Sequence, residues 1–317
     1  MRILFAALAA GCFMWAVRAE AQLRLPSMPY AEGYTLAAST ADPVPSTAPK
    51  PDADQQRSRP TPDELRLRNA GLITAGALLV GAYGLNQWWN EGFTGEFRTE
   101  NEGWFGQGTK YGGADKLGHA FFAYGGTRLL SEAFEAAGND PRHARALGFW
   151  TSLAILTSVE VLDGFSRQFK FSGQDAIMNV VGAGLGLLLE RNQDLDRLVD
   201  IRLLYKQSSG SDWDPAGDYT GQTYLLVGKA SGVPALSRHS VLRYFELAVG
   251  YGTRGYETPG AERQRNLYYG ISLNLSEVLG QTVFRGAKER SGAQRATDLF
   301  LEFIQVPGTA ALARHQL

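Results

Sequence analysis

The segment NLYYGISLNLSEVL, residues 266–279, decides the fold class of this chain of 317 residues. From Leu267 to Leu275 every second residue is large and apolar, and most residues between them are small or polar. A period of two is typical of a strand with one buried face. The same alternation in residues 245–251 predicts a neighbouring strand, because a connection that contains Gly and Pro, residues 255–265, separates the two segments.

Other segments of the C-terminal part extend this sheet. TYLLVGKA (residues 223–230), DLFLEFIQV (residues 298–306) and residues 201–205 are predicted to form further strands. Together they predict an antiparallel meander of about five strands. A barrel assembled from several chains is the alternative, since a single-chain outer-membrane barrel needs about eight strands or more.

Upstream of the strands the sequence has a helical pattern. Thr61 is followed by Pro62 and, three positions after Thr61, by Glu64, which together form a strong helix start with a capping box. The helix continues into residues 70–89, which carry no charge and are about long enough to cross a bilayer. Three shorter apolar segments follow, residues 117–130, 146–162 and 176–189.

The predicted fold class is therefore α+β. A bundle of about four apolar helices is expected in residues 61–200 and a β-rich C-terminal region in residues 201–317. Within the last helix, GAGLG at 182–186 has the small-xxx-small spacing that lets two helix backbones approach closely.

The N-terminus indicates export. Arg2, an apolar run over residues 3–17 and the small-x-small sequence at 19–21 predict a signal peptide over residues 1–21. An uncleaved anchor is the alternative, although the run is short for a span. Residues 22–60 are rich in Pro, Ala, Ser and Thr and predict a disordered linker.

Cys12 is the only cysteine and lies in LAAGC, which invites a lipoprotein interpretation with an acylated Cys12. Residues 13–17, however, continue the apolar run and do not open a polar tether. Cleavage after Ala21 is therefore preferred. The mature chain would then carry no thiol, hence no disulfide and no cysteine-ligated metal.

Charge and hydropathy bear on whether the protein binds nucleic acid and whether it lies in a membrane. The net charge is −1, with 31 basic and 32 acidic residues. The sequence has no block of basic residues, so a nucleic-acid-binding protein is not expected. The apolar segments favour a membrane, but the mean hydropathy of −0.19 is low for a protein with several spans. Arg66 and Arg68 before the first helix favour a cytoplasmic start, which conflicts with export. A peripheral or partly embedded bundle reconciles these signals, and true spans are the alternative.

Polar residues interrupt the apolar helices at three places. The spacings of the pairs Asp115/His119, Glu160/Asp163 and Asp175/Asn179 put each pair on one helix face, so three polar faces are expected to converge. Such groups are costly to bury unless they pair or bind something. The residues are Asp115, Lys116 and His119 in the second helix, Glu160 and Asp163 in the third, and Asp175 and Asn179 in the fourth.

Three roles stay open for these residues. As candidate catalytic groups, His119 is a general base oriented by Asp115, and Lys116 neutralises a phosphate or carboxylate. As candidate metal ligands, Glu160, Asp163 and Asp175 hold a hard divalent cation, which is the only cofactor considered. The third role is structural.

In the structural role the same residues only stabilise the bundle. Asp115 caps a helix, Ser172 and Asp175 form a capping box, and Lys116 pairs with an acid. The chain has four histidines in unrelated contexts, which makes a multi-histidine zinc site improbable. Signatures of a nucleophile elbow, a phosphate loop, a dinucleotide fingerprint and HExxH are absent.

Several of these motifs resemble those of a known family. GGADKLGHAFFAY, EVLDGFS and FSGQDAIMNVVGAGLG, with DYTGQTY and RNLYYGISLNLSE downstream, are similar to the YfiM-type predicted periplasmic lipoproteins of unknown function. The resemblance covers most of residues 85–280. It implies an envelope location and no reaction.

A more distant similarity is to the VanZ-like membrane proteins. They share an acid-Lys-x-x-His start, a later Glu and an Asp-x-x-x-Asn-x-x-Gly helix. In this sequence those motifs fall on Asp115, Lys116, His119, Glu160, Asp175, Asn179 and Gly182. VanZ-like proteins usually have Gln in place of Asp163 and an Arg before the acidic helix, for which Arg167 or Lys170 is an approximate substitute. That departure weakens any transfer of glycopeptide-resistance function.

The expected function is that of an exported, membrane-associated protein of the cell envelope with a structural or accessory role. Its partners would be a membrane or an envelope lipid, the outer membrane among them, and an envelope protein. The alternative is an enzyme or binding protein that acts on a lipid-linked or phosphate-bearing envelope molecule through the polar residues. An enzyme is the less favoured of the two.

Overall fold

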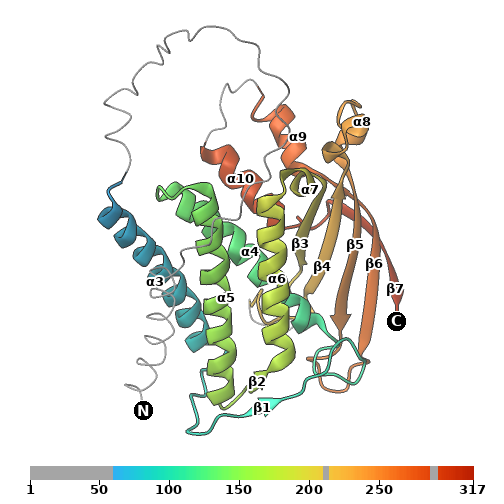
Figure 1. Ribbon diagram of the computed structural model, residues 1–317. Helices are drawn as coiled ribbons and strands as arrows, with labels where there is room; N and C mark the ends of the chain where they lie inside the picture. The colour runs from blue at the N-terminus through green and yellow to red at the C-terminus, as the bar shows by residue number, and fades with distance from the viewer. Residues whose placement is uncertain (1–59, 210–213, 286–291) are drawn as a thin grey trace, which may run out of the picture.

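The structure is a computed structural model that describes residues 60–209, 214–285 and 292–317. The predicted signal peptide and the linker as far as residue 59 lie outside these residues. Four long helices lie beside a five-stranded antiparallel sheet, as Figure 1 shows. The α+β class with a helical bundle followed by a β-meander is thus confirmed.

The helices of the first half are α3 (Pro62–Gln87), α4 (Ala114–Ala136), α5 (Pro141–Phe165) and α6 (Gly173–Arg191). Two short parallel strands, β1 (Thr99–Glu100) and β2 (Phe171–Ser172), join the connections at one end of these helices.

The second half begins with α7 (Gln193–Leu198) and β3 (Val199–Tyr205). The other strands are β4 (Gln222–Lys229), β5 (Phe245–Arg254), β6 (Gln264–Leu273) and β7 (Ala310–Gln316). Short helices α8 (Pro234–Ser237), α9 (Leu275–Thr282) and α10 (Gly292–Phe303) lie between strands, with 3₁₀ turns at Ala230–Gly232 and Leu242–Tyr244.

The start of α3 agrees with the sequence. Thr61 is the N-cap, and Thr61 and Glu64 form the reciprocal capping box. Few residues of α3 are buried, so it lies at the edge of the bundle. Asn69 anchors it through two hydrogen bonds with Asn139, which follows α4.

Glycines bring α4 and α6 into direct contact. A Cβ atom added to Gly182 would lie 1.9 Å from the carbonyl oxygen of Ala120, and one added to Gly186 would lie 2.8 Å from that of Tyr124. No side chain fits at this distance. The GAGLG sequence therefore has the backbone-contact role that its spacing predicts.

The strand order is β3-β4-β5-β6-β7, each antiparallel to its neighbour. The prediction that residues 298–306 form a strand is wrong, because α10 occupies Gly292–Phe303 and the fifth strand is β7. Leu299 and Phe303, four residues apart, both pack into the core, and a short apolar run fits either period. The alternation of β6 also ends before Leu275, because the Asn274 side chain caps α9.

The main core lies where α4 meets one end of the sheet. Phe121 and Tyr124 of α4 pack with Leu203 of β3, Tyr224 of β4 and Phe303 of α10. The core thus covers the part of this sheet face that β3 and β4 form. Farther along the same face, large apolar side chains of β5 and β6 are exposed.

Within the described residues, α5 is the helix whose length and composition would allow it to cross a membrane. Its apolar window is 33% buried, and it contacts α3, α4 and α6. Packing inside the bundle is a second explanation for its apolar sequence, since a core helix passes the same test.

Candidate functional site

Lys116 is enclosed by carboxylates near the start of α4. Its Nζ lies 2.5 Å from Glu102 Oε2, 2.7 Å from Asp115 Oδ2 and 2.9 Å from Asp175 Oδ1, and the side chain is 1% exposed. Burial alone would lower the pKa of Lys116, but the carboxylates of Asp175 and Asp115 outweigh it and raise that pKa. Lys116 is therefore a fixed ammonium group at the junction of three acids.

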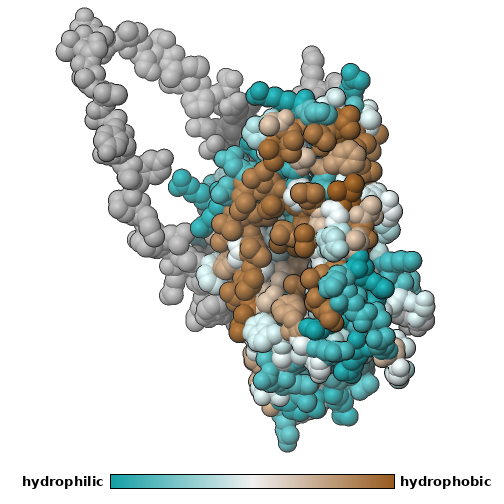
Figure 2. Space-filling model, turned by 90° about the vertical axis from the view of Figure 1, so that its right-hand side faces the viewer, coloured by the Kyte–Doolittle hydropathy of each residue, from teal (hydrophilic) through white to brown (hydrophobic). Residues whose placement is uncertain are grey.

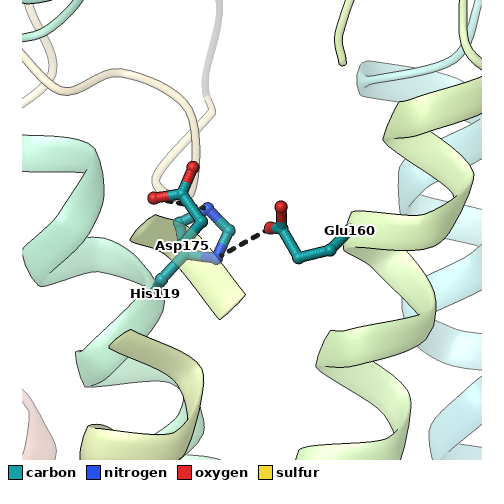
Figure 3. A group of neighbouring side chains, drawn as sticks. All are labelled: His119, Glu160 and Asp175. Atoms are coloured by element: carbon teal, nitrogen blue, oxygen red, sulfur yellow. Dashed lines mark ion pairs between the residues drawn. The ribbon is translucent and has the colours of Figure 1, made fainter. Parts of the chain in front are cut away.

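His119 lies one helical turn further along α4, between Glu160 and the same Asp175 that binds Lys116. Its Nδ1 is 3.3 Å from Glu160 Oε1 on α5 and 3.3 Å from Asn179 Oδ1 on α6, and its Nε2 is 3.9 Å from Asp175 Oδ1. Figure 3 shows the imidazole ring between the carboxylates of Glu160 and Asp175. Three helices thus contribute to one set of contacts.

Glu160 is an acid buried within α5. Its side chain is 2% exposed; Oε2 accepts the backbone N–H of Ser172 at 3.4 Å, and Oε1 receives no hydrogen bond. Burial, together with the charges of Asp175 and Asp163, raises the pKa of Glu160 to about 9. The surroundings of this carboxyl group therefore stabilise its ionised form poorly.

Ser172 stabilises the start of α6. As its N-cap, the Ser172 hydroxyl accepts the backbone N–H of Asp175 at 3.3 Å. Glu160, from α5, binds the Ser172 backbone N–H that Asp175 would bind in a complete capping box. The Asp175 carboxylate therefore faces Lys116 and His119 instead. Burial raises the pKa of Asp175, although His119 and Lys116 oppose the shift.

Asp163 does not lie with the other predicted site residues. Its Oδ1 accepts a hydrogen bond from Trp89 Nε1 at 2.6 Å, which ties the end of α5 to the segment after α3. Burial raises the pKa of Asp163 to about 7, and the bond from Trp89 opposes the shift. The ligand atoms that lie within 4.8 Å of one another come from His119, Glu160 and Asp175, without Asp163.

Asp115 also has a different partner from the one that helical spacing indicates. It accepts hydrogen bonds from the backbone N–H and the Nζ of Lys116. The groups within 4 Å of the His119 ring nitrogens are Glu160, Asp175 and Asn179. Orientation of the imidazole therefore comes from α5 and α6.

Glu102 was not predicted from the sequence. It lies in the connection between β1 and α4, where it binds Lys116 and, at 3.1 Å, Lys110. A loop has no periodic pattern, and nothing in the local sequence marks Glu102 as a partner of Lys116. We call Glu102, Asp115, Lys116, His119, Glu160, Asp175 and Asn179 the polar cluster.

The sheet closes one side of the cluster. A Cβ atom on Gly118 would lie 2.9 Å from the Tyr224 hydroxyl and 3.5 Å from the Tyr219 ring, so Gly118 allows this close packing. Tyr219 also stacks on Tyr111, with ring centroids 4.5 Å apart. Tyr219 and Tyr224 thus pack closely against α4 at Gly118.

Part of the chain is similar to a known protein family. Residues 101–191 match the family described as "Predicted periplasmic lipoprotein (DUF2279)". No curated protein and no solved structure gives a significant match. The matched region contains every residue of the polar cluster and none of the five-stranded sheet.

This match confirms the predicted resemblance to periplasmic lipoproteins of unknown function for the helical region. The family description agrees with an exported protein of the cell envelope. The similarity to VanZ-like membrane proteins stays a prediction.

Proposed function

We propose that this exported envelope protein associates peripherally with a lipid membrane through an apolar face, and that the polar cluster stabilises the helices behind this face. The observation that carries the proposal is a continuous set of exposed apolar side chains on α6 and the sheet. Helix α6 contributes to both the polar cluster and the apolar face, so contacts that hold the cluster together also keep this part of the face in position.

The first part of the apolar face is a row along α6. It lies on the side of α6 opposite the glycines that contact α4, and no charged residue occurs between Asp175 and Glu190. A helix at the surface of a water-soluble protein normally has polar residues at such positions. The exposed residues of the row are Ile177, Val180, Val181, Leu185 and Leu188.

The second part of the apolar face lies on the sheet. Leu247 pairs with Ile271, and Val249 pairs with Tyr269, which puts all four side chains on one face. Leu226, Leu267 and Leu273 extend this exposed set. Leu189 of α6 belongs to the core cluster with Leu203 of β3 and Tyr224 of β4, which places the C-terminal end of α6 near these strands. Figure 2 shows apolar side chains gathered in a band on this side and polar side chains at its lower end.

Bilayer lipid is the occupant that these observations favour. Exposed apolar patches of this extent mark interaction surfaces, and a face built from both a helix and strands without a charged side chain suits acyl chains better than a polar partner. The match of residues 101–191 to a periplasmic lipoprotein family favours a location near a membrane for such a surface. An envelope protein as partner would be the competing explanation.

The contacts of Lys116 argue against the alternative in which the cluster binds a phosphate or carboxylate. Its ammonium group is already held by Glu102, Asp115 and Asp175, and the side chain is almost fully buried. An entering anion would meet these carboxylates before it reached the cation. This geometry agrees better with a structural role for Lys116, in which its ammonium group holds the three acids together.

Vesicle binding tests the proposal. Residues 22–317, which lack Cys12 and the predicted signal, should co-sediment with phosphatidylcholine vesicles. The double variants V181E/L185E on α6 and L247E/I271E on the sheet should each weaken binding at least about tenfold, since each removes two apolar contacts. L78E/L79E on α3 is the matched control and should bind normally.

Two results would contradict the proposal: no binding by the unaltered chain, or loss of binding only in the α3 control. In cells, membranes that contain the full chain with Cys12→Ser should release it in a carbonate wash. Retention after the wash would contradict peripheral attachment. Separation of inner from outer membranes identifies which membrane binds the protein.

A further inference from the structure

We infer that His119, Glu160 and Asp175, with Asn179 as a further ligand, form a binding site for one divalent transition-metal ion such as Zn²⁺ or Mn²⁺. This inference concerns the polar cluster alone and does not depend on lipid binding. It differs from the sequence prediction of a hard-cation site, because a histidine takes the place that Asp163 was expected to fill.

The spacing of the ligand atoms fits such an ion. His119 Nδ1 lies 3.3 Å from both Glu160 Oε1 and Asn179 Oδ1. Tetrahedral zinc with bonds of about 2.0–2.1 Å separates its ligand atoms by about 3.3 Å. One ligand atom from each of His119, Glu160 and Asp175 lies within 4.8 Å of the other two. Asp175 Oδ1 lies nearest to Nε2, at 3.9 Å, so an ion bound through Nδ1 requires the imidazole ring or the Asp175 side chain to turn.

Unpartnered buried atoms are an independent sign of a ligand. Glu160 Oε1 is buried and receives no hydrogen bond, and it points at His119. Asn179 is completely buried, and its Oδ1 lies 3.3 Å from His119 Nδ1, on the same side of the ring as Glu160. Native proteins rarely leave buried polar atoms unpaired, and a bound ion can satisfy an oxygen that receives no hydrogen bond.

The charges of the cluster also leave room for one divalent ion. Four carboxyl groups, those of Glu102, Asp115, Glu160 and Asp175, lie near two ammonium groups, those of Lys110 and Lys116. The acids therefore outnumber the cations, and a divalent cation would compensate carboxylates that Lys110 and Lys116 do not reach. Buried charge of one sign without compensation is strongly unfavourable.

Lys116 decides which carboxylates the ion uses. A second group of acids, Glu102, Asp115 and Asp175, also lies within 4.8 Å, but the Lys116 ammonium bonds to all three. A metal there would have to displace this ammonium. The group that contains His119 meets Lys116 through Asp175 alone, and His119, 20% exposed, gives the ion a path from solvent.

The chemistry of the ligands selects the class of ion. Imidazole nitrogen is typical of zinc and other transition metals, whereas magnesium and calcium prefer oxygen alone. Carboxylate and amide oxygens suit manganese as well as zinc. A ligand set with one nitrogen and several oxygens therefore favours Zn²⁺ or Mn²⁺ over Mg²⁺ and Ca²⁺.

Metal analysis of the full chain tests the inference. Protein purified without chelator, or stripped and then reloaded with Zn²⁺ or Mn²⁺, should contain about one ion per chain and melt at a higher temperature than the stripped protein. Glu160→Gln and His119→Gln should bind the ion at least about tenfold more weakly, since even residues that only support a ligand contribute this much.

Asp163→Asn is the matched control, because Asp163 is a partly buried acid on the same helix as Glu160 but outside the ligand set. It should bind the ion as the unaltered chain does. The inference fails if folded protein binds neither metal, if only Mg²⁺ or Ca²⁺ raises the melting temperature, or if Asp163→Asn loses the ion while Glu160→Gln keeps it. Circular dichroism of each variant shows whether a loss reflects unfolding, and His119→Asn provides a second substitution if His119→Gln does not fold.

Discussion

Glu160 on α5 accepts the backbone N–H of Ser172, the N-cap of α6, at 3.4 Å. This hydrogen bond joins two helices at the point where Asp175 enters the polar cluster, one turn into α6. The second oxygen of Glu160 faces His119 on α4 at 3.3 Å. A single carboxyl group thus connects the three helices that the site requires.

The first prediction concerns the glycine contact between α4 and α6. Gly182→Ala should reduce the free energy of unfolding by about 1–3 kcal/mol or more, because the added Cβ would meet the backbone of Ala120 and neither backbone can move freely. Gly184→Ala is the control, since no atom lies within 4 Å of its Cβ position, and it should stabilise the protein by about 1 kcal/mol. Urea unfolding measures both; equal effects would exclude a special contact at Gly182.

The second prediction concerns the buried ammonium group. Lys116→Met should destabilise the protein by about 3–5 kcal/mol, because three buried carboxylates would lose their common cation. Lys110→Met should cost less, since Lys110 is partly exposed and contacts Glu102 alone among these acids. Chemical denaturation of both variants checks the order. Equal losses would mean that Lys116 has no special role.

Helical spacing explains how much of this site could be predicted from the sequence. Spacing determines which side chains share a helix face, so the convergence of Asp115, Glu160 and Asp175 followed from their positions. It does not determine which partners they choose. Asp115 binds its neighbour Lys116, and Asp163 binds Trp89 on another segment, because those contacts depend on how the helices are packed.

Two other features could not be read from local sequence. Glu102 reaches Lys116 from a loop, whose course depends on β1 pairing with β2 far along the chain. The segment 298–306 alternates weakly enough to fit a strand, yet the core contacts of Leu299 and Phe303 favour α10. Tertiary packing decided both cases, as it commonly does for short apolar runs.

The third prediction concerns pH and a second buried charge group, in which Arg128 of α4 meets three acids. Arg128 lies 2.7 Å from Glu302, 2.7 Å from Asp196 and 3.4 Å from Glu190. Burial raises the pKa of Glu302 from 4.5 to about 7, with Arg128 opposing the shift and the nearby acids adding to it. One guanidinium group cannot compensate three carboxylates fully.

The sign of the effect follows from linkage. Between pH 4.5 and 7 the folded protein holds a proton on Glu302 that the unfolded chain has released, so the contribution of Glu302 to stability falls as pH rises through this window. The free energy of unfolding should therefore decrease more steeply with pH in the unaltered chain than in Glu302→Gln, by up to about 3 kcal/mol over the window. Urea unfolding at several pH values measures this difference. The exposed Glu135→Gln should follow the unaltered chain, and parallel curves for Glu302→Gln and the unaltered chain would show that the Glu302 carboxyl is not perturbed.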